Sequence, residues 1–157
     1  MKITAFSVGK PHEKYLEEGI KLFSDRIQHY YPFRWEIIPP PRHAGKMDAA
    51  ELKFEEGKIV LSKLQAGDQL ILLDERGKQL SSPDLAQLIT QKANQATSHL
   101  VFLIGGAYGV SDQVTARAQF TWSLSPLVFP HMLVRLILSE QLYRACTIIR
   151  NEKYHHS

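Results

Sequence analysis

The sequence contains one cysteine, Cys146, which excludes an internal disulfide bond. A chain without disulfides is typical of a reducing compartment, which predicts the cytoplasm. No apolar run reaches the roughly eighteen residues that a membrane helix needs, so no membrane partner is expected. The first residues, Met1 to Gly9, also lack the layout of a signal peptide and predict a strand instead.

Metal and dinucleotide motifs are missing as well. The seven histidines stand apart from any cysteine, aspartate or second histidine at ligand spacing, except for the adjacent pair His155 and His156. Adjacent residues rarely chelate one ion, so no metal is expected. The turn after the first predicted strand lacks the G-x-G-x-x-G run of nucleotide-binding folds. A phosphate-cradling loop of the P-loop type is absent too.

Acidic residues are absent from one long stretch. No Asp or Glu occurs between Asp112 and Glu140, whereas Arg117, His131 and Arg135 all lie there. The same stretch contains the proline-bounded apolar loop Leu124–Pro130. We expect this loop to form the floor of a ligand site. The net charge of +3 permits a polyanionic partner such as RNA without requiring one.

The hydrophobic pattern alternates between strands and helices along the whole chain. Alternation of this kind predicts a single α/β domain, residues 1–157, with a mainly parallel sheet covered by helices on both faces. The predicted strands are 3–8, 35–38, 70–73, 100–104 and 120–124. The predicted helices are 12–30, 48–64, one beginning at the cap Ser82 before Pro83, 111–118 and 131–149.

Ligands in such folds bind beyond the carboxyl ends of the strands. Three of these ends carry unusual loops, namely Leu73–Lys78, the glycine-rich turn Gly105–Gly109, and Leu124–Pro130. A glycine turn alone is more often only a turn, so the prediction rests on the three loops together.

The last helix and the tail carry the remaining candidates. Arg135 lies in an otherwise apolar turn, so its charge must be paired or must face a site. Glu140 and Arg144 are four residues apart, and an ordinary exposed ion pair is the alternative interpretation for both. The tail from Arg150 to His156 combines cations with Tyr154, which suits RNA, although terminal tails are usually just disordered.

These residues together resemble the RlmH (YbeA-like) family of SPOUT methyltransferases, over essentially the whole chain. The matching motifs are Ser7-Val-Gly-Lys10, Glu56-Gly57, Leu72-Leu-Asp74 with Gly77-Lys78, Ile104-Gly-Gly106 with Gly109, Leu124-Ser125, Phe129-Pro-His131, Arg135, Glu140-Gln-Leu-Tyr-Arg-Ala145 and Tyr154-His155.

The resemblance implies a fold, an activity and partners. It implies a SPOUT-type parallel sheet with a deep C-terminal trefoil knot over roughly 70–150, a substrate-binding tail at 151–157, and a homodimer. It also implies methyl transfer from S-adenosylmethionine to N3 of a pseudouridine in 23S ribosomal RNA, within the large subunit or the ribosome. A SPOUT enzyme acting on tRNA and an inactive ribosome-associated binding protein stay open as alternatives.

The family's pattern also implies individual site residues. The matching cofactor contacts are Leu73, Gly105, Leu124, Ser125, Pro126, Leu127, Val128 and Phe129. For the chemistry, Arg135 and Arg144 are candidates to hold the developing anion or a phosphate. Tyr154 and His155 are candidates to contact the base, with His155 the better proton acceptor at neutral pH.

Overall fold

A five-stranded parallel sheet in the order β2-β1-β4-β3-β5 forms the centre of the computed structural model, which describes residues 1–156. The strands are β1 (Lys2–Val8), β2 (Phe33–Ile38), β3 (Gln69–Gln79), β4 (His99–Ile104) and β5 (Phe120–Ser123). The helices are α1 (Lys14–Ile27), α2 (Ala49–Ser62), α3 (Ser82–Asn94), α4 (Asp112–Arg117) and α5 (His131–Ile149), with a 3-10 turn, η1 (Ala44–Lys46), before α2. The expected α/β class and the parallel sheet are confirmed.

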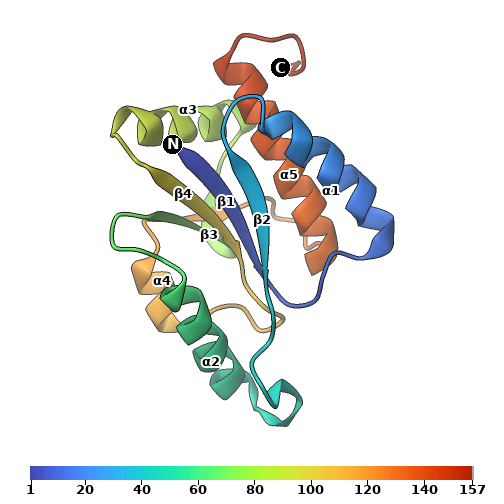
Figure 1. Ribbon diagram of the computed structural model, residues 1–157, viewed down its shortest axis with the longest axis vertical. Helices are drawn as coiled ribbons and strands as arrows, with labels where there is room; N and C mark the ends of the chain where they lie inside the picture. Colours follow the sequence, from blue (N-terminus) through green and yellow to red (C-terminus); the bar gives the residue numbers. More distant parts are fainter. Residues whose placement is uncertain (157) are drawn as a thin grey trace.

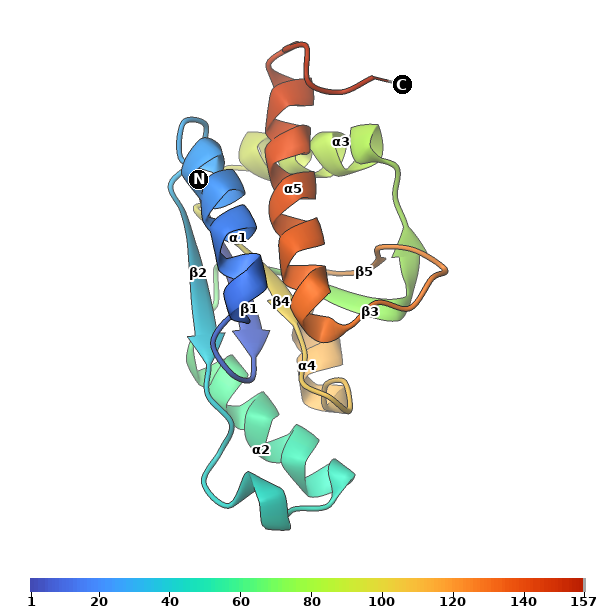
Figure 2. The same ribbon diagram turned by 90° about the vertical axis from the view of Figure 1, so that its right-hand side faces the viewer.

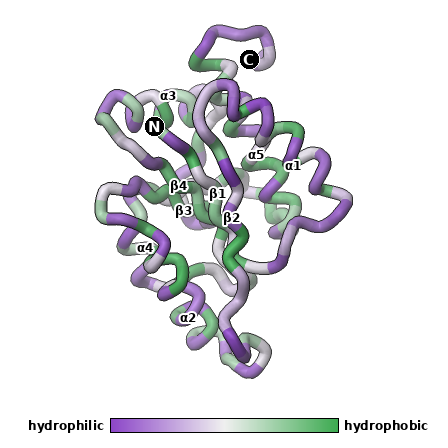
Figure 3. Tube along the Cα trace, viewed as in Figure 1, coloured by the Kyte–Doolittle hydropathy of each residue, from purple (hydrophilic) through white to green (hydrophobic). Residues whose placement is uncertain are grey.

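Helices cover both faces of the sheet, as Figures 1 and 2 show, with α1, α3 and α5 on one face and α2 and α4 on the other. Side chains of β4 alternate between the two layers. Leu100, Phe102 and Ile104 join the core under α3 and α5, while Val101 and Leu103 join the core under α2 and α4. All six residues of β4 are buried, because a central parallel strand has no solvent face. Hydrophobic residues accordingly concentrate in the middle of the molecule (Figure 3).

Strand β3 extends well beyond the predicted residues 70–73. It pairs with β5 up to Leu73, passes through an irregularity, and pairs again from Lys78 onward. The second contact is very close, since a Cβ on Gly77 would lie 2.5 Å from the carbonyl oxygen of Thr121. Only glycine permits this approach, which apolar periodicity cannot reveal.

Two helix starts follow from local capping. Asp48 accepts a hydrogen bond from the backbone N–H of Glu51 at 2.8 Å, as expected. The cap of α3 is Ser81 and not Ser82, so that prediction was wrong by one residue. Ser81 and Asp84 form a reciprocal capping box, which places Ser82 inside the first turn.

None of the helices within residues 1–156 is long and apolar enough to cross a membrane. The strand order alone does not decide whether the chain is knotted, so the trefoil knot stays a prediction.

Candidate active site

A cleft of about 630 Å³ lies at the carboxyl ends of β4 and β5 and beside the irregularity of β3 that follows Leu73. Its walls come from the three segments expected from the sequence, together with His131 and Val134 at the start of α5. The segment Leu73–Lys78, predicted as a loop, lies within β3, because the chain resumes its pairing with β5 at Lys78. The volume lies within the range of about 300–1,000 Å³ that small-molecule sites occupy. The cleft can therefore hold a ligand of nucleoside size.

The glycine turn after β4 brings backbone close to the cleft. A Cβ on Gly105 would lie 2.7 Å from Cγ1 of Val110, and one on Gly106 would lie 2.7 Å from Oε1 of Glu56. Gly109 has a φ of +86° and pairs with Gly106 in an isolated bridge. Crowding excludes a side chain at Gly105 and Gly106, and the positive φ of Gly109 disfavours one there, so these three residues offer only peptide groups to a ligand.

The loop after β5 exposes large apolar side chains beside this turn. Leu127 is 71% exposed and Val128 is 83% exposed, although both lie at the cleft. The loop is held by Ser125, whose hydroxyl accepts a hydrogen bond from the backbone N–H of Leu127 at 3.0 Å. At the inner wall, the indole N–H of Trp122 is buried without a hydrogen-bond partner among the described residues. Exposed apolar groups beside backbone polar groups fit a flat heterocycle such as adenine.

Charged and titratable groups stand at the rim of the cleft. Two hydrogen bonds from the guanidinium of Arg76, at 3.0 and 2.9 Å, hold the pKa of the Asp74 carboxyl below its usual value. Burial, and then the nearby charge of Arg135, lowers the pKa of His131. His131 is therefore a neutral imidazole at physiological pH, able to accept or donate a hydrogen bond.

Comparison with known proteins identifies the family of the chain. The family model described as "Predicted SPOUT methyltransferase" matches residues 1–155. The chain belongs to the SPOUT methyltransferase family.

Individual relatives of this SPOUT protein are similar over their full lengths. The chain is 47% identical to a protein of Cytophaga hutchinsonii and 46% identical to one of Christiangramia forsetii, each over 156 residues. The alignments cover 99% of this chain and 100% and 99% of the two relatives, and both are named ribosomal RNA large subunit methyltransferase H. The expected RlmH family is thus confirmed.

A solved structure supports the fold alone. A probable methylase family protein from Haemophilus influenzae superposes with a TM-score of 0.55 at 9% identity, covering 99% of this chain and 70% of that one. At this identity the likeness concerns the arrangement of strands and helices and not the chemistry.

Most of the predicted cofactor residues of this SPOUT chain meet at the cleft. Those among its lining residues are Leu73, Gly105, Leu124, Ser125, Leu127, Val128 and Phe129. Pro126 is exposed in the same loop and does not line the cleft. The sequence missed Lys53 and Trp122, because only tertiary packing brings α2 and the end of β5 to this place. The sequence also indicated no cofactor contact for His131, which lines the cleft and lies in the acid-free stretch.

The other predicted residues form a separate cluster at the far end of α5. Arg144 donates to Oε1 of Glu140 from Nε at 2.9 Å and from Nη2 at 2.6 Å. The hydroxyl of Tyr154 donates to the same oxygen at 3.1 Å, and Nη1 of Arg144 lies 3.3 Å from Nδ1 of His155. The guanidinium of Arg144 also lies 4.8 Å from the centre of the Tyr154 ring. The tail is therefore packed against α5 through Tyr154 and His155, whereas His156 is exposed and Ser157 lies outside the described residues.

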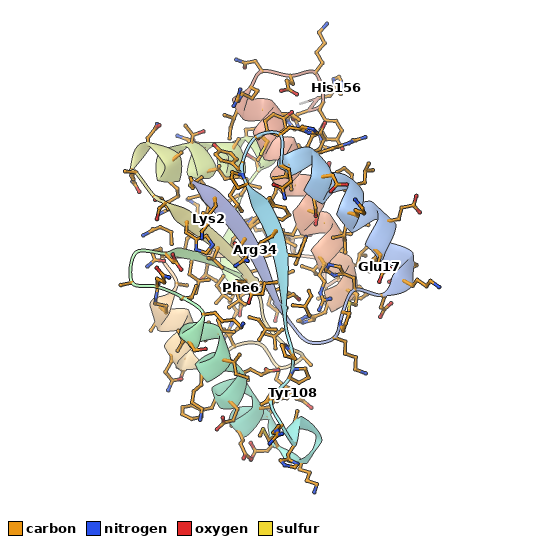
Figure 4. The ribbon with its side chains drawn as sticks, viewed as in Figure 1. Lys2, Phe6, Glu17, Arg34, Tyr108 and His156 are labelled. Atoms are coloured by element: carbon orange, nitrogen blue, oxygen red, sulfur yellow. The ribbon has the colours of Figure 1, made fainter. Side chains whose placement is uncertain are left out.

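This tail cluster lies far from the cleft within one chain. Arg144 follows His131 by 13 positions on α5, which corresponds to roughly 20 Å at 1.5 Å per residue. Figure 4 agrees, since His156 and Tyr108 of the glycine turn lie toward opposite ends of the molecule. The structure thus brings Arg144, Tyr154 and His155 together but not to the cofactor loops.

Arg135 belongs to neither group. Its side chain is only 2% exposed and is held under the loop between β1 and α1. Nε donates to the hydroxyl of Ser7 at 2.9 Å, and Nη1 donates to the carbonyl of Lys10 at 2.8 Å. Within residues 1–156, no cluster of His, Cys, Asp or Glu is arranged to hold a metal ion.

Proposed function

We propose that this SPOUT protein transfers the methyl group of S-adenosylmethionine to N3 of a pseudouridine in 23S ribosomal RNA. The observation that carries the proposal is full-length similarity, at 38–47% identity, to relatives named ribosomal RNA large subunit methyltransferase H. A cleft of suitable size at the expected strand ends supports it. The proposed substrate is the large subunit or the ribosome in the cytoplasm, because the described residues form one α/β unit, which suits recognition of a structured particle by its shape.

The residues of the cleft fit S-adenosylmethionine. Leu73, Leu124, Leu127 and Phe129 would enclose the adenine, and the backbone at Gly105 would meet its polar edge. Covering Leu127 and Val128 with the ligand would remove apolar surface that is now in water. The bound donor supplies an electrophilic methyl carbon whose bond to sulfur breaks as N3 attacks, leaving a neutral thioether.

The imide N3–H must lose its proton for this attack, and His155 is the proposed acceptor. In the present arrangement Nδ1 of His155 faces the guanidinium of Arg144, which can only donate. The neutral ring therefore carries its proton on Nε2, so His155 can accept a proton only after this contact is exchanged. Nη1 of Arg144 would then be available to stabilise the developing charge on the base, while Glu140 keeps holding Arg144 and Tyr154 in place.

A second copy of the chain could bring the tail residues to the cofactor cleft. The roughly 20 Å between His131 and Arg144 separates the proposed proton acceptor from the proposed methyl donor. We propose the homodimer that the family resemblance implies, with the tail of one chain completing the cleft of the other. The trefoil knot remains part of this proposal and would order the cofactor loops.

The direct test is methylation of large subunits and whole ribosomes that lack the modification, using a labelled donor and mapping the modified nucleotide. The proposal expects label at N3 of one pseudouridine with the wild-type chain, and at least a 100-fold slower single-turnover rate with His155→Ala. Label on tRNA would refute the proposal in favour of a tRNA methyltransferase. No binding of S-adenosylmethionine at micromolar concentration would refute it in favour of an inactive ribosome-associated binding protein.

A further inference from the structure

An arginine without a counter-ion lies next to the cleft, on the face of α5 that meets the loop between β1 and α1. The Arg135 guanidinium is enclosed, yet no carboxylate within residues 1–156 lies within 4 Å of it. Its recorded partners are the Ser7 hydroxyl, the Lys10 carbonyl and His12, whose Nδ1 lies 3.2 Å from Nη1. A buried cation with only neutral partners is costly, and an anion would relieve that cost.

The third nitrogen of this guanidinium is free and faces a notch. Nη2 makes no hydrogen bond to the described residues. Gly9 lies beside it with a φ of +138°, and a Cβ there would meet only Nη2, at 3.6 Å, with no other atom within 4 Å. The missing side chain at Gly9 therefore leaves open space, the notch, beside an accessible donor of an otherwise buried side chain.

Further cationic and donor groups belong to the segments next to Gly9 and Arg135. Lys10 is exposed in the same loop, and His131 lies one helical turn before Arg135. The first turn of α5 holds no acidic residue, and its N-cap Pro130 supplies no side-chain cap, so its N–H groups are open to an anion. The nearest opposing charges are the exposed carboxylates of Glu13 and Glu17 on the rim.

We infer that Arg135, Lys10 and the adjoining imidazoles of His12 and His131 form a binding site for a phosphodiester of the substrate RNA. This inference rests on the proposed function for the identity of the ligand. His131 lines the cofactor cleft and is near enough to Arg135 for that charge to lower its pKa, so an anion bound at Arg135 would lie beside the place where the methyl group would be transferred. That position suits a backbone phosphate flanking the target nucleotide, and phosphate contacts fix register in RNA recognition.

The two histidines give the site a measurable proton linkage. Burial and the charge of Arg135 lower the pKa of both His12 and His131, while Glu17 opposes this at His12. Trp35 packs edge-on against His12, with ring centres 5.3 Å apart, and brings no charge. A bound phosphate reverses the repulsion from Arg135, so binding raises both pKa values and strengthens as the pH falls from about 8 to about 6.

The first test uses inorganic pyrophosphate as the probe and needs no RNA. Imidazole NMR signals of His12 and His131 should shift saturably as pyrophosphate is added, with their pKa values rising. Lys10→Ala should weaken this binding at least threefold and Arg135→Lys at least tenfold, because one ammonium cannot bind Ser7 and the Lys10 carbonyl as the guanidinium does and also donate to an anion beside Gly9. Lys58→Ala removes the same charge from α2 and should change nothing. Non-saturable shifts, or an equal effect of Lys58→Ala, would overturn the site.

The second test separates this site from the proposed function. In methylation of large subunits, Lys10→Ala should raise KM for the subunit about tenfold and leave the Kd of S-adenosylmethionine unchanged. It should also reduce the slope of log affinity against log salt by roughly 0.7 to 0.9, the share of one phosphate contact. Arg135→Lys needs a melting curve beside it, whereas Lys10 is exposed and its variant should fold normally.

The outcomes are distinguishable. Saturable pyrophosphate binding without methylation of any subunit keeps the anion site and refutes the proposed function. Methylation by the wild-type chain with unchanged KM and salt slope in Lys10→Ala keeps the function and refutes the site. A shift of the sedimentation coefficient to that of a monomer in Lys10→Ala would instead mean that a carboxylate of a second copy occupies the notch, which also refutes the inference.

Discussion

Arg144 donates two hydrogen bonds to Oε1 of Glu140, from Nε at 2.9 Å and from Nη2 at 2.6 Å. The two side chains are only 25% and 20% exposed. The same oxygen accepts the hydroxyl of Tyr154, so Glu140 joins the tail to the last helix. An exposed pair of this spacing would contribute only a few tenths of a kcal/mol, but here it orders the residues proposed for catalysis.

Replacing Glu140 should therefore damage catalysis more than stability. In Glu140→Ala, Arg144 and Tyr154 lose their common acceptor, and the turnover rate should fall at least tenfold. The free energy of unfolding should fall by about 1 kcal/mol, or roughly 2–4 °C in Tm for a chain of this size. The Kd of S-adenosylmethionine, measured by calorimetry, should stay within twofold. The control is Lys21→Ala, which breaks the exposed i,i+4 ion pair between Lys21 and Asp25. This change should alter neither the rate nor the Tm appreciably. A large loss of cofactor binding would show that Glu140 acts on the cleft directly.

The glycine turn should tolerate no added side chain. In Gly106→Ala the new Cβ would lie 2.7 and 2.8 Å from the two carboxylate oxygens of Glu56, so the turn or helix α2 must shift. We expect a loss of about 1–3 kcal/mol in unfolding free energy and at least tenfold weaker binding of S-adenosylmethionine. Gly67→Ala is the matched control, because a Cβ there meets no atom within 4 Å. Equal binding by both variants in calorimetry would mean that the turn does not shape the site.

Helix and strand positions followed largely from the sequence, for a physical reason. Buried parallel strands such as Leu100–Ile104 must be continuously apolar, and α5 begins directly after a proline, so both appear in the residue pattern. The extension of β3 beyond Leu73 escaped prediction because it depends on the contact between Gly77 and Thr121, which is tertiary. The cap Ser81 escaped for a smaller reason, since two neighbouring serines compete and only the reciprocal bond with Asp84 decides.

The candidate site divides in the same manner. The loops after β4 and β5 were predictable because topology alone brings the ends of parallel strands together. The segment after Leu73 was wrongly predicted as a loop, because its renewed pairing with β5 is a tertiary contact. The roughly 20 Å between His131 and Arg144 follows from the predicted helix 131–149, but the packing of Tyr154 and His155 against α5 was not predictable, since it depends on tertiary contacts. Arg135 follows the physical rule that a charge in an apolar turn needs partners. Those partners are Ser7 on β1 and Lys10 in the following loop, 128 and 125 positions away in the sequence.

Leu127 should matter for ligand binding and not for folding. The side chain is 71% exposed in the free chain, so Leu127→Ser removes little buried surface and should leave Tm unchanged. Covering a leucine with a ligand contributes roughly 1.5 kcal/mol, so binding of S-adenosylmethionine should weaken about tenfold. Leu22→Ser, at 46% exposure on α1, should leave binding unchanged. Unaltered affinity in Leu127→Ser would exclude this loop from the adenine pocket.

Glu56 should make stability depend on pH in a direction opposite to that of an ion-paired carboxylate. The side chain is 7% exposed on α2 behind Gly106, and burial raises the pKa of its carboxyl. A raised pKa in the folded state means that folding favours the protonated form. The stabilising contribution is then complete below the unfolded value, near pH 4.5, and is lost as the pH rises through the folded value.

Glu56→Gln removes this titration while keeping the shape of the side chain. Its Tm should exceed that of the wild-type chain by a few degrees at about pH 8, and the difference should vanish at about pH 4, where Glu56 is protonated. Glu55→Gln is the neighbouring control, since Glu55 is 32% exposed and pairs with Lys58 at 2.9 Å. Thermal melts of the three proteins across this range measure the effect. A Tm advantage of Glu56→Gln that persists undiminished at low pH would show that charge burial is not its cause.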